Sequence, residues 1–306
     1  MATSETGLPN SWARGSLWGM TKRVQVVTFI GAGGKTTCLR SLTQEIVSAG
    51  QRVIATTTTK VFPEEQMNSW RNPNPPPFEQ EGACFWYVNV IEESGKWIGP
   101  PLKAVDKAIG RARADLNVGI QELLLNVSAS TNVNTSKSMR GQRTVPELPE
   151  LHDLYWVIEG DGARGLKLKC WQPHEPQIPQ RSDCVVLVLD GGLWGRVLQA
   201  EQVHRPAGCP DLIGHVWNAE KAWRYFLRSP LFTPQYGQMS WVILLNIHGG
   251  NSDNEDLVEP LEPLNELKHR WAEIEQEVNA LEYRPKHLCI AAGDAKEGKL
   301  LWFDLW

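Results

Sequence analysis

A lysine and two threonines follow a glycine-rich turn near the start of the sequence. In "VVTFIGAGGKTTCLRSL", Lys35, Thr36 and Thr37 come directly after three glycines within four residues. Glycines let backbone N–H groups approach phosphate oxygens, and a helix beginning at Lys35 would point its positive end at them. Lysine would neutralise charge on the β- and γ-phosphates, and the Thr36 hydroxyl could bind Mg²⁺. The predicted phosphate-binding loop consists of Gly31, Ala32, Gly33, Gly34, Lys35, Thr36 and Thr37.

This loop departs from the usual phosphate-loop pattern. The pattern G-x-x-x-x-G-K-[ST] needs a glycine at the position of Phe29, so only Gly31-x-x-Gly34-Lys35-Thr36 remains. The alternative interpretation is a glycine turn into a helix with an exposed lysine. An apolar strand before the loop and a helical pattern after it favour phosphate binding.

Two carboxylates end another apolar run. In "LYWVIEGDGARG", Glu159 is the first polar residue and Asp161 follows two positions later, so both face the same side of an extended chain. Together with Thr36, Asp161 (or Glu159) would hold Mg²⁺ or a water of its shell, and a carboxylate could orient the attacking water. Arg164, with Lys167 or Lys169, could then contact phosphate or an anionic substrate. The alternative is a G-x-G turn in which the aspartate caps a bend, but two acids and an arginine within six residues favour a functional site.

Two further strand ends carry polar side chains. The run "ATTTTK" offers hydroxyls, including that of Thr58, that could reach Mg²⁺ or phosphate, although threonine also simply favours strands. In "LLNIHGG", Asn246 stands where GTP-binding proteins often carry N-K-x-D. Ile247 and Gly249 replace the lysine and the acid, so the sequence does not predict GTP.

Two loops contain histidines that could shape a substrate pocket. His174 and Glu175 lie in "QPHEPQIPQRSD", and His204, Arg205 and Cys209 lie in "EQVHRPAGCPD". These types can bind zinc, but no pair of them has a recognisable ligand spacing. No nucleophile pattern such as G-x-S-x-G occurs, so a serine or zinc hydrolase is not expected.

The elements that must position these residues follow a βαβ order. "VQVVTFI" and "RVIATTTT" have the length and β-branched composition of strands. Between them, apolar residues recur at helical spacing and the pattern stops at Gly50. Strand, loop, helix and strand within about 30 residues form the unit of a parallel sheet.

Four more apolar runs extend this sheet. "LYWVIEGDG", "CVVLVLDGG", "SWVILLNIHGG" and "HLCIAAGD" each end in glycine, aspartate or asparagine. Near-continuous apolar strands are typical of a parallel sheet covered on both faces, and ligands bind beyond the carboxyl ends of such strands. The fold class is therefore α/β, with a mostly parallel phosphate-loop-type sheet flanked by helices.

Segments of different composition set the expected domain limits. Residues 1–22 are expected to be a flexible leader, and residues 23–306 a single α/β nucleotide-binding domain. A proline-rich surface excursion with a small β-hairpin is expected at 63–100. The Ser/Thr/Asn-rich residues 126–150 are predicted to be a disordered insertion.

Composition excludes several classes of protein. The 306 residues, 42% of them hydrophobic, can bury a substantial core, and a net charge of −4 gives no general attraction to nucleic acid or membrane. No window approaches 18 apolar residues, and no secretory signal is visible. The six cysteines lack C-x-x-C spacing, which argues against a disulfide framework and favours a reducing cytoplasm.

Taken together, these motifs resemble those of the selenium-dependent hydroxylase accessory proteins, the YqeC-like family. That family carries G-A-G-G-K-T-[ST], T-T-T-K, E-A-D-G-[AS]-[RK]-G-x-x-x-K, H-E-P-x-[IV]-P and V-H-R in this order. The sequence has "GAGGKTT", "TTTK", "EGDGARGLKLK", "HEPQIP" and "VHR", and the resemblance covers about residues 24–62 and 154–206. Departures are Gly160 in place of alanine, and Cys170 with Trp171 after the last lysine of the acidic motif.

The resemblance implies a P-loop-like nucleotide-binding fold and a role in the maturation of molybdenum hydroxylases that need a labile selenium cofactor. It implies that Glu159 and Asp161 form the acidic motif and that the nucleotide loop consists of Gly31, Gly33, Gly34, Lys35 and Thr36. His174, Glu175, His204 and Arg205 fall on other signature positions of the family. The shortened loop also resembles that of Mur-type peptide ligases, an analogy that favours ATP over GTP.

The expected function is a cytoplasmic, Mg²⁺-dependent nucleotide-binding protein with NTPase activity that assists hydroxylase cofactor maturation. One alternative is an ATP-dependent ligase or kinase acting on a small anion. Another is a non-catalytic carrier of a nucleotide or of a molybdopterin dinucleotide. The expected partners are a nucleotide and a molybdenum hydroxylase or its cofactor, with no nucleic acid and no membrane; the sequence does not predict the oligomeric state.

Overall fold

A mostly parallel sheet of ten strands organises the chain. The computed structural model describes residues 12–77, 81–131, 153–247 and 259–306. The eight strands from β14 to β5 run parallel, while β15 is antiparallel to β14 and β1 is antiparallel to β15. In order across the sheet, the strands are β1 (Ala13–Gly15), β15 (Lys299–Asp304), β14 (His287–Asp294), β13 (Ser240–Asn246), β11 (Cys184–Asp190), β2 (Val26–Gly31), β9 (Leu154–Glu159), β3 (Arg52–Thr57), β6 (Ala83–Tyr87) and β5 (Asn68–Arg71).

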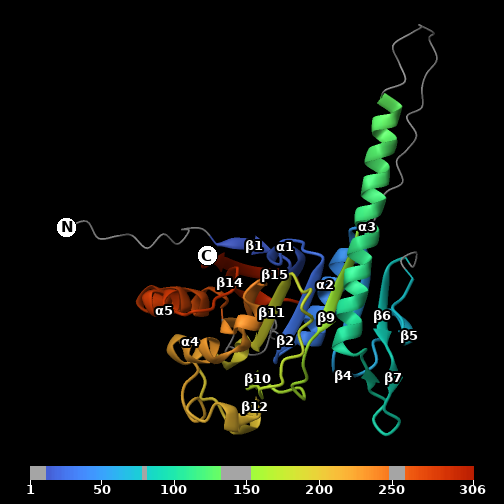
Figure 1. Ribbon diagram of the computed structural model, residues 1–306. Helices are drawn as coiled ribbons and strands as arrows, with labels where there is room; N and C mark the ends of the chain where they lie inside the picture. Colours follow the sequence, from blue (N-terminus) through green and yellow to red (C-terminus); the bar gives the residue numbers. More distant parts are fainter. Residues whose placement is uncertain (1–11, 78–80, 132–152, 248–258) are drawn as a thin grey trace.

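The remaining elements surround this sheet (Figure 1). Two small sheets contain β4 (Lys60–Val61), β8 (Trp97–Ile98) and β7 (Asn89–Val90), and β10 (Leu168–Lys169) with β12 (Val203–His204). The α-helices are α1 (Leu17–Met20), α2 (Lys35–Ser48), α3 (Leu102–Thr131), α4 (Ala219–Arg228) and α5 (Leu261–Asn279). Short 3₁₀ helices are η1 (Gly191–Leu193), η2 (Ala200–Gln202), η3 (Pro206–Gly208), η4 (Pro230–Phe232) and η5 (Pro234–Tyr236).

Helices cover both faces of the sheet, which explains the continuous apolar strands. Along β2, Val27 and Phe29 belong to the core that includes α1 and α2. Val26 packs in the core with α3, and Ile30 in the core with α4 and α5. Successive side chains of a strand alternate between faces, so a strand buried on both sides must be apolar throughout.

The predicted α/β class and the strand runs at β2, β3, β9, β11, β13 and β14 are confirmed. After the excursion the chain returns to the centre of the sheet, where β9 lies between β2 and β3. After β9 the chain continues on the other side of β2, through β11, β13 and β14. β2 therefore lies at a point where the direction of winding changes, and open α/β sheets bind ligands at such points.

The structure differs from two expectations about chain organisation. The expected leader contains β1 and α1, and the buried Leu17 and Met20 fix α1 to the sheet. Within the expected excursion, β5 and β6 belong to the main sheet, and only β7 and β8 form the predicted hairpin. The apolar run "ACFWY" joins the sheet because Phe85 and Trp86 bury their rings on its opposite faces.

The helix α3 reaches beyond the body of the protein, as Figure 1 shows. Its backbone is helical to Thr131, so the first residues of the expected insertion at 126–150 continue a helix. The rest of that insertion lies outside the described residues. In the part of the chain that the structure describes, no helix is long and apolar enough to cross a membrane.

Candidate functional site at the carboxyl ends of β2, β9 and β11

The turn between β2 and α2 requires glycine for steric reasons. Gly31 has φ +95°, and an added Cβ would lie 2.3 Å from the carbonyl oxygen of Val188. Gly33 has φ +79°, and its Cβ would lie 2.2 Å from the backbone nitrogen of Asp190. Both φ values disfavour side chains, and neither approach leaves room for one. The glycines therefore hold the loop tightly against β11.

Backbone N–H groups of this loop are already used inside the protein. Gly31 N lies 3.1 Å from both carboxylate oxygens of Asp161, and Ala32 donates to Val188 O. Gly33 donates to Leu166 O. The N–H groups of the first turn of α2 have no helical carbonyl to bond. Any phosphate at this loop would meet the start of α2 rather than the amides of residues 31–33.

Lys35 joins the loop to the acidic motif. Its ammonium donates to Gly31 O at 2.7 Å and lies 3.4 Å from Asp161 Oδ1 and 4.0 Å from Glu159 Oε1. The side chain is only 6% exposed, and Asp161 is 1% exposed. The sequence-based expectation that both carboxylates face one side agrees with this geometry. Lys35 lies near these carboxylates because their strands are adjacent: Phe29 of β2 pairs with Glu159 of β9.

Glu159 also contacts the threonine of the loop. The Thr36 hydroxyl donates to Glu159 Oε2 at 2.9 Å. Burial raises the pKa of Glu159, although the charge of Lys35 and the Thr36 hydrogen bond oppose the shift. A hydroxyl and a carboxylate in contact are hard oxygen ligands of the kind that Mg²⁺ prefers.

Asp161 has a different environment from Glu159. Besides Gly31 N and Lys35, it contacts the ammonium of Lys169 at 3.3 Å and accepts a hydrogen bond from Trp171 Nε1 at 2.9 Å. Its oxygens thus face N–H donors and two lysines, which leaves little room for a cation. Of the two acids, Glu159 is therefore the better candidate for the metal, and Asp161 is better suited to hold the loop and Lys35 in place.

A chain of alternating charges leads away from Asp161. Lys169 is completely buried, donates to Gly162 O at 2.7 Å and lies 3.4 Å from Glu175 Oε1. Glu175 in turn pairs with Arg205. The predicted residues of three motifs are thus brought together. Lys169 is buried and engaged with Asp161 and Glu175, whereas Glu175 also lines a second cavity.

A basic cavity of about 820 Å³ opens beside the loop. Its walls carry more basic than acidic side chains, and strand ends, the loop after β9 and the small β4–β8 sheet all contribute to it. The lining residues with charged side chains are Lys35, Arg40, Lys60, Lys96, Glu159, Arg164 and Asp190. Arg40 is held by two hydrogen bonds to Glu64, whereas Lys60 and Arg164 are exposed.

Other predicted residues have structural partners. The Thr58 hydroxyl donates to Gln177 O at 2.8 Å and so ties the end of β3 to the loop after β10. Asn246 donates to Gly33 O and accepts from Ala295 N, so its amide links the phosphate-binding loop to the end of β14. Neither residue lines the basic cavity.

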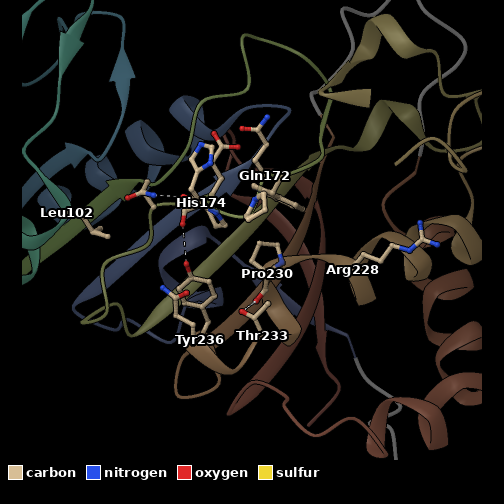
Figure 2. A pocket seen from close by; sticks show the side chains of 13 residues that line it. Leu102, Gln172, His174, Arg228, Pro230, Thr233 and Tyr236 are labelled. Carbon is tan, nitrogen blue, oxygen red and sulfur yellow. Dashed lines mark hydrogen bonds between the residues drawn. The ribbon is translucent and has the colours of Figure 1, made fainter. Parts of the chain in front are cut away.

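The two histidines lie away from the phosphate loop. His174 lines a second cavity of about 590 Å³, together with Trp171, Arg228 and Tyr236 (Figure 2). His204 lies in β12 opposite Lys169, and among the described residues its Nδ1 has no hydrogen-bond partner. Burial and the neighbouring Lys169 and Arg205 lower its pKa.

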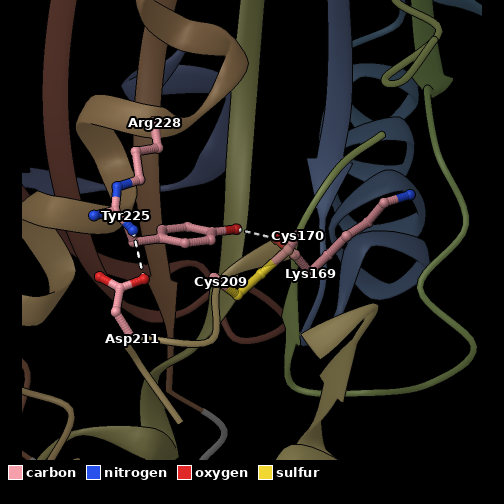
Figure 3. Close-up of a disulfide and its surroundings, with 6 residues drawn as sticks. All are labelled: Lys169, Cys170, Cys209, Asp211, Tyr225 and Arg228. Atoms are coloured by element: carbon pink, nitrogen blue, oxygen red, sulfur yellow. Dashed lines mark hydrogen bonds and ion pairs between the residues drawn. A yellow bond between two sulfur atoms is a disulfide. The ribbon is translucent and has the colours of Figure 1, made fainter. Parts of the chain in front are cut away.

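A disulfide links the chain after β10 to the chain after β12, contrary to the expectation from cysteine spacing. Cys170 and Cys209 are bonded across a separation of 39 residues, with Cα atoms 6.2 Å apart (Figure 3). The pair has no spacing signature because β10 and β12 bring it together: Cys170 N donates to His204 O. The cysteines at 38, 84, 184 and 289 are free and buried.

We expect Cys209→Ser to lower the free energy of unfolding by about 2–4 kcal/mol, because the disulfide restricts the unfolded chain. Urea titration with and without a thiol reductant measures this. Reductant should destabilise the wild type to the level of the variant and leave the variant unchanged. If reductant left the urea midpoint of the wild type unchanged, this disulfide would not stabilise the protein.

No cluster of three or more metal-ligating His, Cys, Asp or Glu residues occurs within the described ranges. The predicted Thr36 and Asp161 therefore do not belong to a closed protein cage for a metal. Mg²⁺ commonly takes one or two protein ligands together with phosphate oxygens and water, so a site for it does not need such a cluster.

Several residues that line the basic cavity are not among the site residues predicted from the sequence. Asp190 ends β11 in the run "CVVLVLDGG", and its place at a strand end was the available signal. Lys60 closes the threonine run and was detectable in the same way. Phe62 and Lys96 gave no signal, because only the pairing of β4 with β8 brings their segments together.

The fold and this site define a class: an α/β protein with a Gly-Lys-Thr turn, two carboxylates and a basic cavity at the carboxyl edge of a mostly parallel sheet. The chain belongs to the YqeC protein family, whose family model matches residues 27–207. That match contains the five motifs on which the resemblance was based.

A curated relative supports this assignment. The chain is 29% identical over 207 residues to a protein of Escherichia coli (strain K12) named uncharacterized protein YqeC. The alignment covers 64% of this chain and 63% of the relative, so the chain spans less than two thirds of that protein's length. No solved structure matches the chain.

Proposed function

We propose that this protein binds a nucleoside triphosphate with Mg²⁺ at the turn between β2 and α2 and hydrolyses it. The observation that carries the proposal is the convergence of Lys35, Thr36 and Glu159 in one basic cavity. Phosphoryl transfer requires positioning and charge stabilisation more than covalent chemistry, and these residue types supply both.

Each side chain has a role that its contacts support. Lys35 neutralises charge on the β- and γ-phosphates, and Arg164 and Lys60 at the cavity wall add further positive charge. Thr36 and Glu159 would hold the metal, directly or through water, and the carboxylate of Glu159 would orient the attacking water. Asp161 holds Gly31 and Lys35 in place through its contacts with Gly31 N and the Lys35 ammonium.

The cellular role in this proposal is that of an accessory factor in maturation of a molybdenum hydroxylase that needs selenium. Support comes from the resemblance of the five motifs. The partner is the hydroxylase or its cofactor, and nucleotide turnover would drive a transfer or a change of partner. ATP is the favoured nucleotide, by the analogy with peptide ligases.

A second candidate is an ATP-dependent ligase or kinase that acts on a small anion. The second cavity favours it, because Trp171 lines that cavity and also donates to Asp161 beside Lys35. An acceptor bound there would lie near the acidic motif. Turnover that appears only with an added acceptor would distinguish this enzyme from a plain NTPase. Nucleotide binding without any turnover would instead favour the other alternative, a non-catalytic carrier.

Calorimetric titration of the wild type tests the proposal. ATP, GTP, CTP and tripolyphosphate are titrated with Mg²⁺ and again with a chelator, and phosphate release is followed separately. Binding that depends on Mg²⁺ is expected for the nucleotides and for tripolyphosphate. A folded wild type that binds none of them would refute the phosphate site.

The raised pKa of Glu159 predicts how binding depends on pH. A protonated carboxyl cannot bind Mg²⁺, so affinity should fall as pH decreases through a value above the ordinary 4.5. Glu159→Gln should weaken Mg²⁺-dependent binding about tenfold at pH 7.5 and remove the pH dependence of the metal contribution. Titrations from pH 5 to 8 check this, with Glu93→Gln in an exposed turn as the control. An unchanged profile in Glu159→Gln would assign the metal to another group.

A further inference from the structure

An exposed phenylalanine lies at the wall of the basic cavity. Phe62 is 65% exposed, more than the other large hydrophobic residues that are exposed among the described residues. Leaving this ring in water forgoes the stabilisation that its burial would give. The ring is thus left exposed at the same cavity that Lys35 and Thr36 line.

The segment that carries this ring forms part of the cavity wall. Val61 is buried and pairs with Trp97 of β8, while its neighbours Lys60 and Phe62 are both exposed. All three residues line the cavity, and Phe62 directly follows β4. The exposed ring therefore lies where a ligand in the cavity can reach it.

A cation holds the ring from one side. Lys96 Nζ lies 4.5 Å from the centroid of the Phe62 ring, and Lys96 directly precedes β8. The contact is a cation–π interaction, which restricts the ring without covering it. The ring is thus oriented in advance and still has surface available for a ligand.

We propose that Phe62 is the stacking platform for the base of the nucleotide. This inference rests on the proposed function: with the phosphates at Lys35 and the start of α2, the base extends toward the β4–β8 side of the cavity. Lys96 contacts the ring and Lys60 lines the same cavity, so both could meet the sugar and phosphates. Aromatic stacking contributes to binding any nucleobase, because every base has a π-face.

The same inference explains the absence of a base-reading motif at β13. The amide of Asn246 is engaged with Gly33 O and Ala295 N, so it supports the loop. Recognition by stacking does not depend on the hydrogen-bonding edge of a base. On this inference the stacking contact contributes similarly to the binding of ATP and of GTP.

The test compares nucleotides with the phosphate chain alone. Magnesium complexes of ATP, GTP and tripolyphosphate are titrated into the wild type, Phe62→Ala, Phe62→Trp and Tyr283→Ala, an exposed aromatic residue outside the cavity. Phe62→Ala should bind ATP and GTP about tenfold more weakly and tripolyphosphate unchanged. Phe62→Trp should retain nucleotide affinity, and Tyr283→Ala should behave as the wild type.

Other outcomes separate the two proposals. Equal affinity of the wild type for ATP and tripolyphosphate, or an unchanged ATP affinity in Phe62→Ala, would overturn the platform while the phosphate site stands. An equal loss of tripolyphosphate and ATP binding in Phe62→Ala would also overturn it, because the ring would then act on the phosphate site. Failure of the wild type to bind any of the three would overturn both proposals.

Discussion

Replacing Lys35 with alanine is expected to weaken binding of a magnesium nucleoside triphosphate by about 100-fold or more. The ammonium is nearly buried at the wall of the basic cavity, where a charge interacts more strongly than it does in water. Without it, the two carboxylates beside the loop would repel the phosphates. Calorimetry with wild type and variant measures the ratio of dissociation constants, and phosphate release should fall with occupancy.

The control for Lys35→Ala must remove a charge elsewhere. Lys107→Ala suits this purpose, because Lys107 is exposed on α3 and does not line the cavity. Circular dichroism must show that Lys35→Ala is folded at the titration temperature, since Asp161 and Glu159 lose a counter-ion. A folded variant that binds within threefold of the wild type would remove Lys35 from the phosphate site.

The largest loss of stability is expected from Lys169→Met. We expect the free energy of unfolding to fall by about 3–5 kcal/mol, because breaking a buried ion pair leaves an uncompensated charge. Lys169 is completely buried and contacts Asp161, Glu175 and Gly162 O. Methionine fills a similar volume, so the change removes charge rather than packing.

Lys167→Met is the matched control for this prediction. Lys167 lies two residues away, is 43% exposed, and lies 3.7 Å from the carboxylate of Asp190. Partly exposed pairs contribute about 0–1 kcal/mol, so this variant should unfold near the wild-type urea concentration. If both variants had the same urea midpoint, Lys169 would not stabilise the fold through its charge.

The strands at the centre of the fold could be predicted because both of their faces are buried. The runs of β2, β9, β11, β13 and β14 are nearly continuous in apolar residues, a pattern typical of parallel strands that are covered on both faces. The edge strands have no such pattern. β1 consists of three residues without a buried face, and its pairing with β15 depends on the whole intervening chain.

Part of the site could be predicted for the same reason. Glu159 follows a recognisable strand, and Lys35 follows a recognisable loop, so parallel pairing of β2 with β9 was enough to bring them together. Contacts that depend on irregular segments could not be predicted. The bond between Cys170 and Cys209 and the contact of Phe62 with Lys96 need the short pairings β10–β12 and β4–β8, which carry no periodicity.

The hydrogen bonds of Gly31, Ala32 and Gly33 to Asp161, Val188 and Leu166 have a consequence for the rate of ligand capture. In the proposed complex the loop would be fixed before a phosphate arrives, so binding would cost little conformational entropy. Association would then be governed by diffusion toward the basic cavity and not by the folding of a loop. The ammonium of Lys35, which donates to Gly31 O, would exchange that acceptor for the ligand while the backbone stays in place.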